Sequence, residues 1–373
     1  MTRSIGILTA GGDAPGLNAA IRAIGKSAVR SHDMKVVGFL DGFRGLLEKR
    51  HIRLDSESMS GILTRGGTIL GTGRAKVHKM SIGGQVMDMR EAMVDNARSM
   101  GVDVLVCLGG GGTQKNALRL AKAGMEVITL PKTIDNDVWG TERTFGFDTA
   151  LNIATEAIDR LHSTAHSHHR LMVVEIMGHN TGWLALASGI AGGADVVLIP
   201  EVPYDIDAVA ESLMRRKAAG SRFSIIAVSE GALSLEEAAR MEELRDQKQA
   251  ASTEEEKEAA REARADFESG RSDHTTRLAE DLEARTGIEA RVTILGHVQR
   301  GGTPSPKDRL LATRLGVEAT EAAAEGHTRI MIADRERTAV RVPLDEVAGN
   351  RRVVPLDHPW VVTARRLGMG LGD

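Results

Sequence analysis

Short apolar runs alternate with longer segments of helical periodicity along most of the chain. We predict buried strands at residues 4–9, 35–39, 102–108, 127–130, 171–176, 196–199 and 223–228. Most of these runs lead into a turn rich in Gly, Asp or Glu. Strands that alternate with helical segments are typical of crossover units, so the pattern predicts an α/β fold with mainly parallel sheets.

The length of the chain indicates more than one lobe. A single hydrophobic core stops growing at roughly 250 to 300 residues, and this chain has 373 residues of which 42% are apolar. We therefore expect two Rossmann-like lobes with the active site in the cleft between them. Residues 1–146 with about 299–347 are assigned to the first lobe, and residues 147–298 with about 348–373 to the second.

One segment departs from the alternation of strands and helices. Residues 233–273 consist largely of Glu, Ala, Arg and Lys, with no strand pattern. This composition predicts a charged helical insertion exposed to solvent. An inserted hairpin or partly mobile arm is the simpler interpretation, and a device that binds a partner is the alternative.

Charge and cysteine content exclude several classes of protein. With 48 basic and 51 acidic residues the net charge is −3, which gives no reason to expect a nucleic acid or an anionic membrane as partner. The single cysteine, Cys107, lies in an apolar run and is interpreted as a buried structural thiol. We see neither a targeting segment nor a membrane span and expect a soluble, cytoplasmic protein.

The heptapeptide 131–137, Pro-Lys-Thr-Ile-Asp-Asn-Asp, carries the most informative chemistry. Phosphoryl transfer to an alcohol needs a base for the hydroxyl proton and cations to hold the phosphate charge. In an extended segment Asp135 and Asp137 would point the same way and could serve as proton acceptor and metal ligand. An Asp/Asn-rich turn after a strand is the alternative interpretation.

Three glycine-rich turns follow apolar runs, at residues 9–18, 65–74 and 108–114. Glycine lets backbone N–H groups approach an anion closely, and a helix N-terminus adds the positive end of its dipole. None of the turns has the Walker spacing or a clean dinucleotide fingerprint. Three such turns in one half of the chain, one of them closed by Arg74, favour a polyphosphate ligand.

Six motifs together resemble one family. The segments GGDAPGLNAAIR, RGGTILGTGR, PKTIDND, MGHNTGW, IAGGADVVLIPE and LGHVQRGGTPSPKDR occur in the order and approximate spacing of the 6-phosphofructokinases. The resemblance extends from about residue 4 to residue 316 and is interrupted by the charged insertion. It implies transfer of a phosphoryl group to the 1-hydroxyl of fructose 6-phosphate, giving fructose 1,6-bisphosphate in glycolysis.

The resemblance also implies roles for individual residues. Asp135 matches the general base, Thr133 contacts the reacting phosphoryl group, and Asp137 matches a residue near the Mg2+ cofactor. Lys132 would add a catalytic positive charge. The residues expected to bind the phosphoryl donor are Gly12, Phe43, Arg74, Gly111, Gly112 and Thr113.

The sugar phosphate is expected to contact the second lobe. Glu230 matches a carboxylate that hydrogen-bonds sugar hydroxyls, and Met177, Gly178 and His179 would lie along the sugar. The residues expected at the 6-phosphate are Arg170, Arg291, His297 and Arg300. Because the family donates the arginines matched by Arg170 and Arg291 across a subunit boundary, the resemblance implies a homo-oligomer, and we expect a tetramer.

Two departures from the family pattern leave alternatives open. The family usually has Asp where this chain has Gly111, and Arg where it has His179. A sugar-phosphate-binding relative with little activity or another acceptor sugar is therefore a rival hypothesis. The donor is also open: Gly112 leaves space for a nucleotide and favours ATP, whereas Lys132 is shared with pyrophosphate-dependent members.

Overall fold

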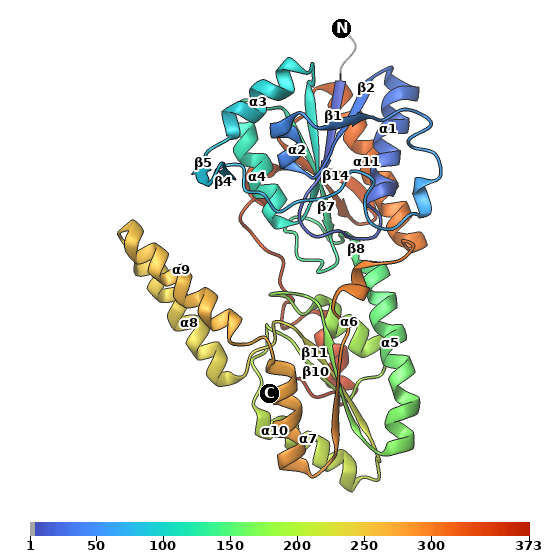
Figure 1. Cartoon of the computed structure of the whole chain (residues 1–373). Helices are drawn as coiled ribbons and strands as arrows, with labels where there is room; N and C mark the ends of the chain where they lie inside the picture. Colours follow the sequence, from blue (N-terminus) through green and yellow to red (C-terminus); the bar gives the residue numbers. More distant parts are fainter. Residues whose placement is uncertain (1–3) are drawn as a thin grey trace. The chain divides into compact units, whose positions relative to one another are not determined.

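The computed structural model describes residues 4–373 and divides into two compact units (Figure 1). Unit 1 comprises Met1–Ala150 and His297–Arg352, and unit 2 comprises Leu151–Gly296 and Val353–Asp373. These bounds differ from the predicted lobe boundaries by a few residues. As a result His297, which the prediction assigned to the second lobe, belongs to unit 1.

Unit 1 is built on a sheet with the strand order β14-β13-β7-β6-β1-β2-β3. The central strands β1 (Ser4–Thr9), β6 (Val104–Gly109) and β7 (Val127–Thr133) are parallel to one another. Nearly every residue in these strands is buried, as expected for a parallel sheet covered on both faces. The remaining strands are β2 (Lys35–Phe39), β3 (His51–Arg53), β8 (Phe145–Gly146), β13 (Ile330–Arg335) and β14 (Thr338–Pro343).

Two hydrophobic clusters cover the two faces of this sheet. Ile5 and Ile7 belong to one cluster and Leu8 to the other, because successive side chains of a strand point to opposite faces. In the first cluster α1 (Leu17–His32) packs against α11 (Pro306–Glu325). The other unit 1 elements are α2 (Phe43–Glu48), α3 (Arg90–Ser99), α4 (Gly111–Lys122), α12 (Leu344–Val347), the short hairpin β4 (Met80–Ile82) and β5 (Gln85–Met87), and the 3-10 turn Ile62–Thr64.

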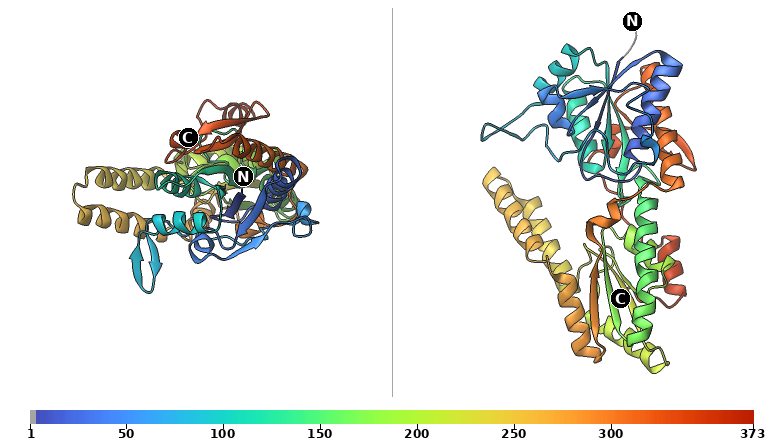
Figure 2. Two further views of the ribbon diagram at one scale, coloured as in Figure 1. Left: turned by 90° about the horizontal axis from the view of Figure 1, so that it is seen from above. Right: turned by 45° about the vertical axis from the view of Figure 1, so that its right-hand side comes forward.

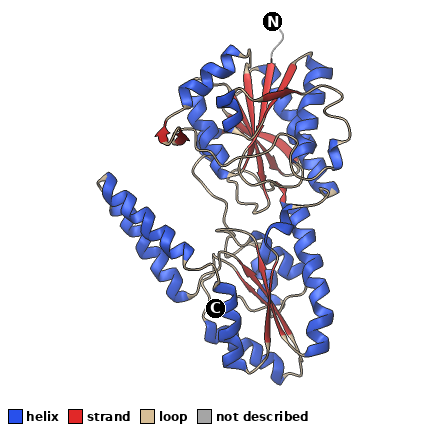
Figure 3. Ribbon diagram, in the orientation of Figure 1, coloured by secondary structure: helices blue, strands red, loops and turns tan. Residues whose placement is uncertain are grey.

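Unit 2 has a smaller parallel sheet with the order β10-β11-β9-β12. Its strands are β9 (Leu171–Ile176), β10 (Val196–Leu198), β11 (Ser224–Ser229) and β12 (Ala290–Ile294). Figure 3 shows helices on both sides of this sheet. They are α5 (Phe147–His168), α6 (Trp183–Ala191), α7 (Ile206–Ala218), α10 (His274–Thr286) and α13 (Pro359–Arg366).

The charged insertion forms two helices, α8 (Leu235–Ala250) and α9 (Glu254–Ser269), which lie side by side (Figures 1 and 2). Each begins with a capping box, at Ser234 and at Thr253. Leu244 and Ala260 are the buried apolar residues of the pair, so most of the hairpin faces solvent.

The seven predicted strands are confirmed, with ends shifted by a few residues. The strands that were not among them are β3, β4, β5, β8, β12, β13 and β14. Within residues 4–373 no helix is both long enough and apolar enough to cross a membrane.

Candidate functional site

The carboxyl ends of β1, β6 and β7 bring three sequence-predicted loops together in unit 1. The Thr113 Oγ1 hydroxyl donates to the Ala10 carbonyl over 3.3 Å, which ties the third glycine turn (108–114) to the first (9–18). Lys132 Nζ donates to the Gly12 carbonyl, which ties the β7 loop to the same turn. Adjacent parallel strands present their carboxyl ends at one edge of a sheet, where α/β proteins bind ligands.

Lys132 is a buried positive charge at this edge, with 3% of its surface exposed. Burial lowers the pKa of its ammonium group to about 8, while Asp135, Asp13 and Asp137 act in the opposite direction and Arg300 adds to the lowering. The ammonium group therefore remains mostly protonated near pH 7. It is a cation held out of water beside carboxylates, an arrangement that is common where charge develops during a reaction.

Arg300 lies against the first glycine turn. A Cβ atom at Gly12 would stand 2.9 Å from Nη1 of Arg300, so a larger residue at this position would require the guanidinium to shift. At Gly111 and Gly112, in the first turn of the 12-residue helix α4, an added Cβ would meet nothing within 4 Å. The backbone at this helix N-terminus is thus open to an approaching anion.

The loop that carries Asp135 is bent rather than extended. The Asp135 N–H donates to Thr133 Oγ1 over 3.0 Å, and Asn136 has a left-handed backbone with φ 54°. The expectation that Asp135 and Asp137 share one face of an extended segment is therefore wrong, because the extended run ends at Thr133. The turn interpretation describes the backbone, and both carboxylates still act electrostatically on Lys132.

Asp137 is the predicted metal ligand. Its carboxylate is 19% exposed and lies 3.8 Å from the Arg351 guanidinium. Among the described residues no group of three His, Cys, Asp or Glu side chains could hold a metal ion. The residues present fit Mg2+ of the kind that keeps several waters and binds one or two carboxylates together with substrate phosphates.

A cavity of about 520 Å³ opens beside the first glycine turn and contains Gly73 and Arg74. Gly73 adjoins the turn directly, since its carbonyl accepts from the Gly11 N–H over 2.9 Å. Within residues 4–373 no carboxylate pairs with Arg74, Lys76 or Lys79, which all line this cavity. Their positive charges are therefore available to a polyanion, and Lys76 and Lys79 are cations that the sequence analysis missed.

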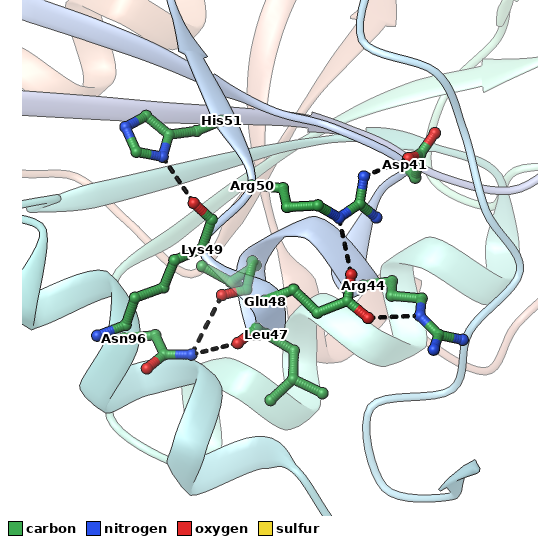
Figure 4. A network of polar contacts seen from close by, with 9 residues as sticks. Asp41, Arg44, Leu47, Glu48, Lys49, Arg50, His51 and Asn96 are labelled. Atoms are coloured by element: carbon green, nitrogen blue, oxygen red, sulfur yellow. Dashed lines mark hydrogen bonds and ion pairs between the residues drawn. The ribbon is translucent and has the colours of Figure 1, made fainter. Parts of the chain in front are cut away.

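The wall of this cavity contains a network of paired charges (Figure 4). Arg50 binds Asp41 and Glu48, and Arg44 binds Glu48 over 2.7 Å. The two arginines hold the pKa of the Glu48 carboxyl below its usual range, Arg44 first. This pairing fixes Asp41 and Arg44, both of which line the cavity.

Phe43 does not take part in this cavity. Its ring is 1% exposed and belongs to a hydrophobic cluster of unit 1, at the first position of α2. Its expected contact with the phosphoryl donor is therefore not supported, because the ring packs in the core.

In unit 2, Glu230 and the turn after β9 form a second predicted grouping. Glu230 follows β11, and its Oε1 accepts hydrogen bonds from the N–H groups of His179, over 2.7 Å, and of Gly178, over 3.5 Å. Met177 is buried beside them, whereas the side chain of His179 is exposed and its backbone has φ 51°. The structure thus brings the predicted sugar contacts together at the carboxyl ends of β9 and β11, which are paired in parallel.

Arg170 and Arg291 lie at the opposite ends of their strands. Arg170 precedes β9 and Arg291 is the second residue of β12, and both side chains bind Glu289, Arg170 over 2.8 Å. The pKa of Glu289 is lowered, chiefly by its hydrogen bond to Arg170. A strand of six residues places these arginines roughly 20 Å from the Met177 turn at its other end.

His297 and Arg300 belong to a 3-10 turn at Gly296–Arg300 that follows β12. His297 is exposed, whereas Arg300 is half-buried against the glycine turn of unit 1. Of the predicted 6-phosphate residues, His297 and Arg300 thus belong to unit 1, and Arg170 and Arg291 to unit 2. Asp13, whose charge acts on Lys132, was not predicted as a site residue, although it follows the glycine pair that was.

Comparisons with known proteins agree on one family. The family model described as "Phosphofructokinase" matches residues 4–323. The chain is 56% identical over its whole length to an ATP-dependent 6-phosphofructokinase of Propionibacterium freudenreichii, of which it covers 100%. It is 49% identical to the ATP-dependent 6-phosphofructokinase of Spirochaeta thermophila, with 100% of this chain and 98% of that protein covered.

Solved structures give the same fold. Phosphofructokinase of Pichia pastoris in the T-state is 32% identical, with a TM-score of 0.76 over 93% of this chain and 35% of that one. A pyrophosphate-dependent phosphofructokinase from Marinobacter aquaeolei has a TM-score of 0.78 at 19% identity, covering 99% of this chain and 88% of the other. At this identity the second likeness bears on the fold alone.

Proposed function

We propose that this chain, which belongs to the phosphofructokinase family, transfers the terminal phosphoryl group of ATP to the 1-hydroxyl of fructose 6-phosphate in glycolysis. One observation carries the proposal. In unit 1 a buried Lys132 links the Gly12 turn to the loop of Asp135, with Arg300 packed on the same glycine. Cations and a carboxylate beside an open helix N-terminus are the groups that phosphoryl transfer requires.

Asp135 is the proposed general base. Its carboxylate accepts the proton of the sugar 1-hydroxyl as the oxygen attacks the terminal phosphorus and the bond to the leaving phosphate breaks. Lys132 stabilises the negative charge of the phosphoryl oxygens from a site that burial keeps dry. The Thr133 hydroxyl, which accepts from the Asp135 N–H, keeps the carboxylate beside the reacting groups.

ATP is the donor that the unit 1 geometry favours over pyrophosphate. Gly112 carries no side chain and faces open space, so nothing at this position fills the room for an inner phosphate. The adjoining cavity with Arg74, Lys76 and Lys79 is large enough for the rest of a nucleotide and offers it three cations. The ATP-dependent relatives, of which the chain covers 100% and 98%, support the same choice.

Mg2+ is the expected cofactor. Asp137, with Asp135 near it, would supply the protein's carboxylates, and the donor phosphates and water the other ligands. The ion neutralises charge on the phosphates when bound. Since Gly111 contributes no carboxylate, the metal would depend mainly on the nucleotide for its place.

Glu230, Met177 and Gly178 are the proposed sugar contacts of unit 2. Arg170 and Arg291, at the far end of the same sheet, lie too distant to reach a ligand beside Glu230 in their own chain. We therefore propose that they serve the site of a second copy, in a homo-oligomer that is a tetramer. In such an oligomer the two arginines of the neighbouring copy would bind the phosphate group of the sugar.

A coupled assay tests the function directly. Wild type and Asp135→Asn are compared with ATP or pyrophosphate as donor and with fructose 6-phosphate or other sugar phosphates as acceptor. We expect ATP with fructose 6-phosphate to be the preferred pair, and Asp135→Asn to lower kcat by roughly 10² to 10⁴-fold, the usual value of a general base. Equal turnover by the variant, or preference for pyrophosphate, would overturn the corresponding part of the proposal.

A further inference from the structure

The C-terminal segment of unit 1 contacts the Asp135 loop at two consecutive carbonyls. The Arg352 guanidinium donates through Nη1 to the Asn136 carbonyl over 3.2 Å, and its backbone N–H donates to the Asp137 carbonyl over 2.9 Å. The preceding residue, Arg351, pairs as an antiparallel bridge with Val138. All these residues lie in unit 1, and Arg352 lies outside the region that the family model matches.

The backbone of the loop turns sharply at Asn136, which is buried and left-handed with φ 54°. Asn adopts this state more readily than most other non-glycine residues, and contacts from elsewhere in the unit hold the turn in place. The Asn136 side chain is already used on the other side of the loop, where Oδ1 accepts from the Thr144 N–H over 3.0 Å. The Asn136 side chain and Arg352 thus hold the turn from two directions.

The Arg352 side chain is half-buried. Its partial removal from water lowers its pKa to about 10, and the Glu142 carboxylate acts in the opposite direction. What the arginine does provide is a planar, directional donor to a loop carbonyl.

We propose that Arg352 is a positioning residue for the proposed base, which fixes the carbonyls of Asn136 and Asp137 and thereby the direction of the Asp135 carboxylate. This inference rests on the proposed function. It adds a residue of the C-terminal segment to the machinery, acting through the backbone of the loop. A small displacement of a reacting group can reduce the rate by about 10²-fold, so its effect should fall on kcat.

The test compares Arg352→Met and Arg352→Lys with Arg309→Met as the matched control. Arg309 is equally half-buried, lies in the same unit, and donates to a backbone carbonyl, that of Pro304, over 2.6 Å. We expect Arg352→Met to lower kcat by about 10 to 100-fold with both KM values changed less than about threefold. Methylguanidine added to Arg352→Ala, whose truncated side chain leaves room for it, should restore part of the lost rate, and Arg309→Met should behave as wild type.

A second measurement does not depend on activity. In hydrogen–deuterium exchange the amides of Asp135 and Thr144, which the turn protects, should exchange about tenfold faster in Arg352→Met and unchanged in Arg309→Met. The melting temperature should change by less than about 5 °C. If Arg352→Met does not fold, kcat and amide exchange are compared between Arg352→Lys and Arg309→Met instead, and we expect a smaller effect.

The outcomes separate the two proposals. No turnover by wild type would contradict the proposed function and leave the exchange result to decide the positioning role. Normal turnover by wild type with an unchanged kcat in Arg352→Met and Arg352→Lys would overturn the positioning role alone. Loss of rate without rescue and with equal exchange would also overturn it, since the loop would then be undisturbed.

Discussion

The two units differ in how completely one chain assembles its part of the proposed site. In unit 1 the Gly12 turn, Lys132 and Arg300 are connected by direct contacts within the chain. In unit 2 the proposed sugar contacts are divided between the two ends of one sheet, with Glu230 at one end and Arg170 at the other. Unit 1 thus contains the whole of the proposed donor site, whereas the proposed sugar site of unit 2 would be completed by a second copy.

The strongest test of this contrast uses hybrid oligomers. Asp135→Asn removes the proposed base and Arg170→Ala removes a group proposed to act in the neighbouring copy, so each variant alone should retain little activity. Co-expression should recover roughly a quarter of wild-type activity, because a two-fold interface gives each mixed pair one intact site. Coupled assays of the separated species measure this recovery.

Two variants in the same unit provide the control for that experiment. Asp135→Asn mixed with Lys132→Met places both defects in unit 1, and no mixed pair of these chains should regain an intact site. Recovery in this control, or none with Arg170→Ala, would contradict the division between the units.

Substitutions of Lys132 test the proposed donor site of unit 1. Because its pKa is about 8, the cation is lost as the pH rises through that value, and kcat/KM for ATP should fall above pH 8. Lys132→Met should lower kcat/KM by roughly 10² to 10³-fold, in the range for one lost electrostatic contact, and should show no such alkaline limb. Lys132→Arg, which keeps its charge, should move the limb to higher pH. If Lys132→Met showed the same decrease in kcat/KM above pH 8, that decrease would arise from the titration of another group.

A substitution of Glu230 tests the proposed sugar site of unit 2. Glu230→Gln keeps an oxygen that can accept from the His179 N–H but removes the negative charge, so the turn should persist. We expect KM for fructose 6-phosphate to rise about tenfold, the worth of one charge-assisted hydrogen bond, with KM for ATP within twofold. Glu237→Gln, at the first turn of α8, is the control within unit 2. Equal changes in both KM values would mean that Glu230 acts only on the fold.

The sequence predicted the arrangement of the proposed donor site in unit 1 better than that of the proposed sugar site in unit 2. Lys132 and the glycine turns follow buried strands whose apolar runs mark them clearly, so their meeting at one sheet edge follows from the order of the elements. The pairing of Arg170 and Arg291 through Glu289 depends on the register of β9 and β12, and the sequence predicted no strand at β12. Periodicity carries no information on such a register.

Two local errors have similar physical causes. Phe43 follows a strand and resembles an exposed aromatic contact, but the tight turn at Gly42, with φ 69°, starts α2 with that ring turned into the core. The bend at Asn136 depends on partners far along the chain, among them Arg352. A tertiary contact of this kind leaves no local pattern.

The smallest effect is expected at the hairpin of α8 and α9, which belongs to unit 2 but contains none of the proposed site residues. Leu244 is its most buried side chain, 1% exposed. Leu244→Ala should destabilise the hairpin by about 2 to 5 kcal/mol, as for other buried leucines, and speed its cleavage in limited proteolysis. Both kcat and KM should stay within about twofold, and exposed Arg245→Ala on the same helix should alter neither cleavage nor activity. A large loss of activity in Leu244→Ala would contradict this expectation. It would mean that the hairpin contributes to the proposed sugar site of unit 2.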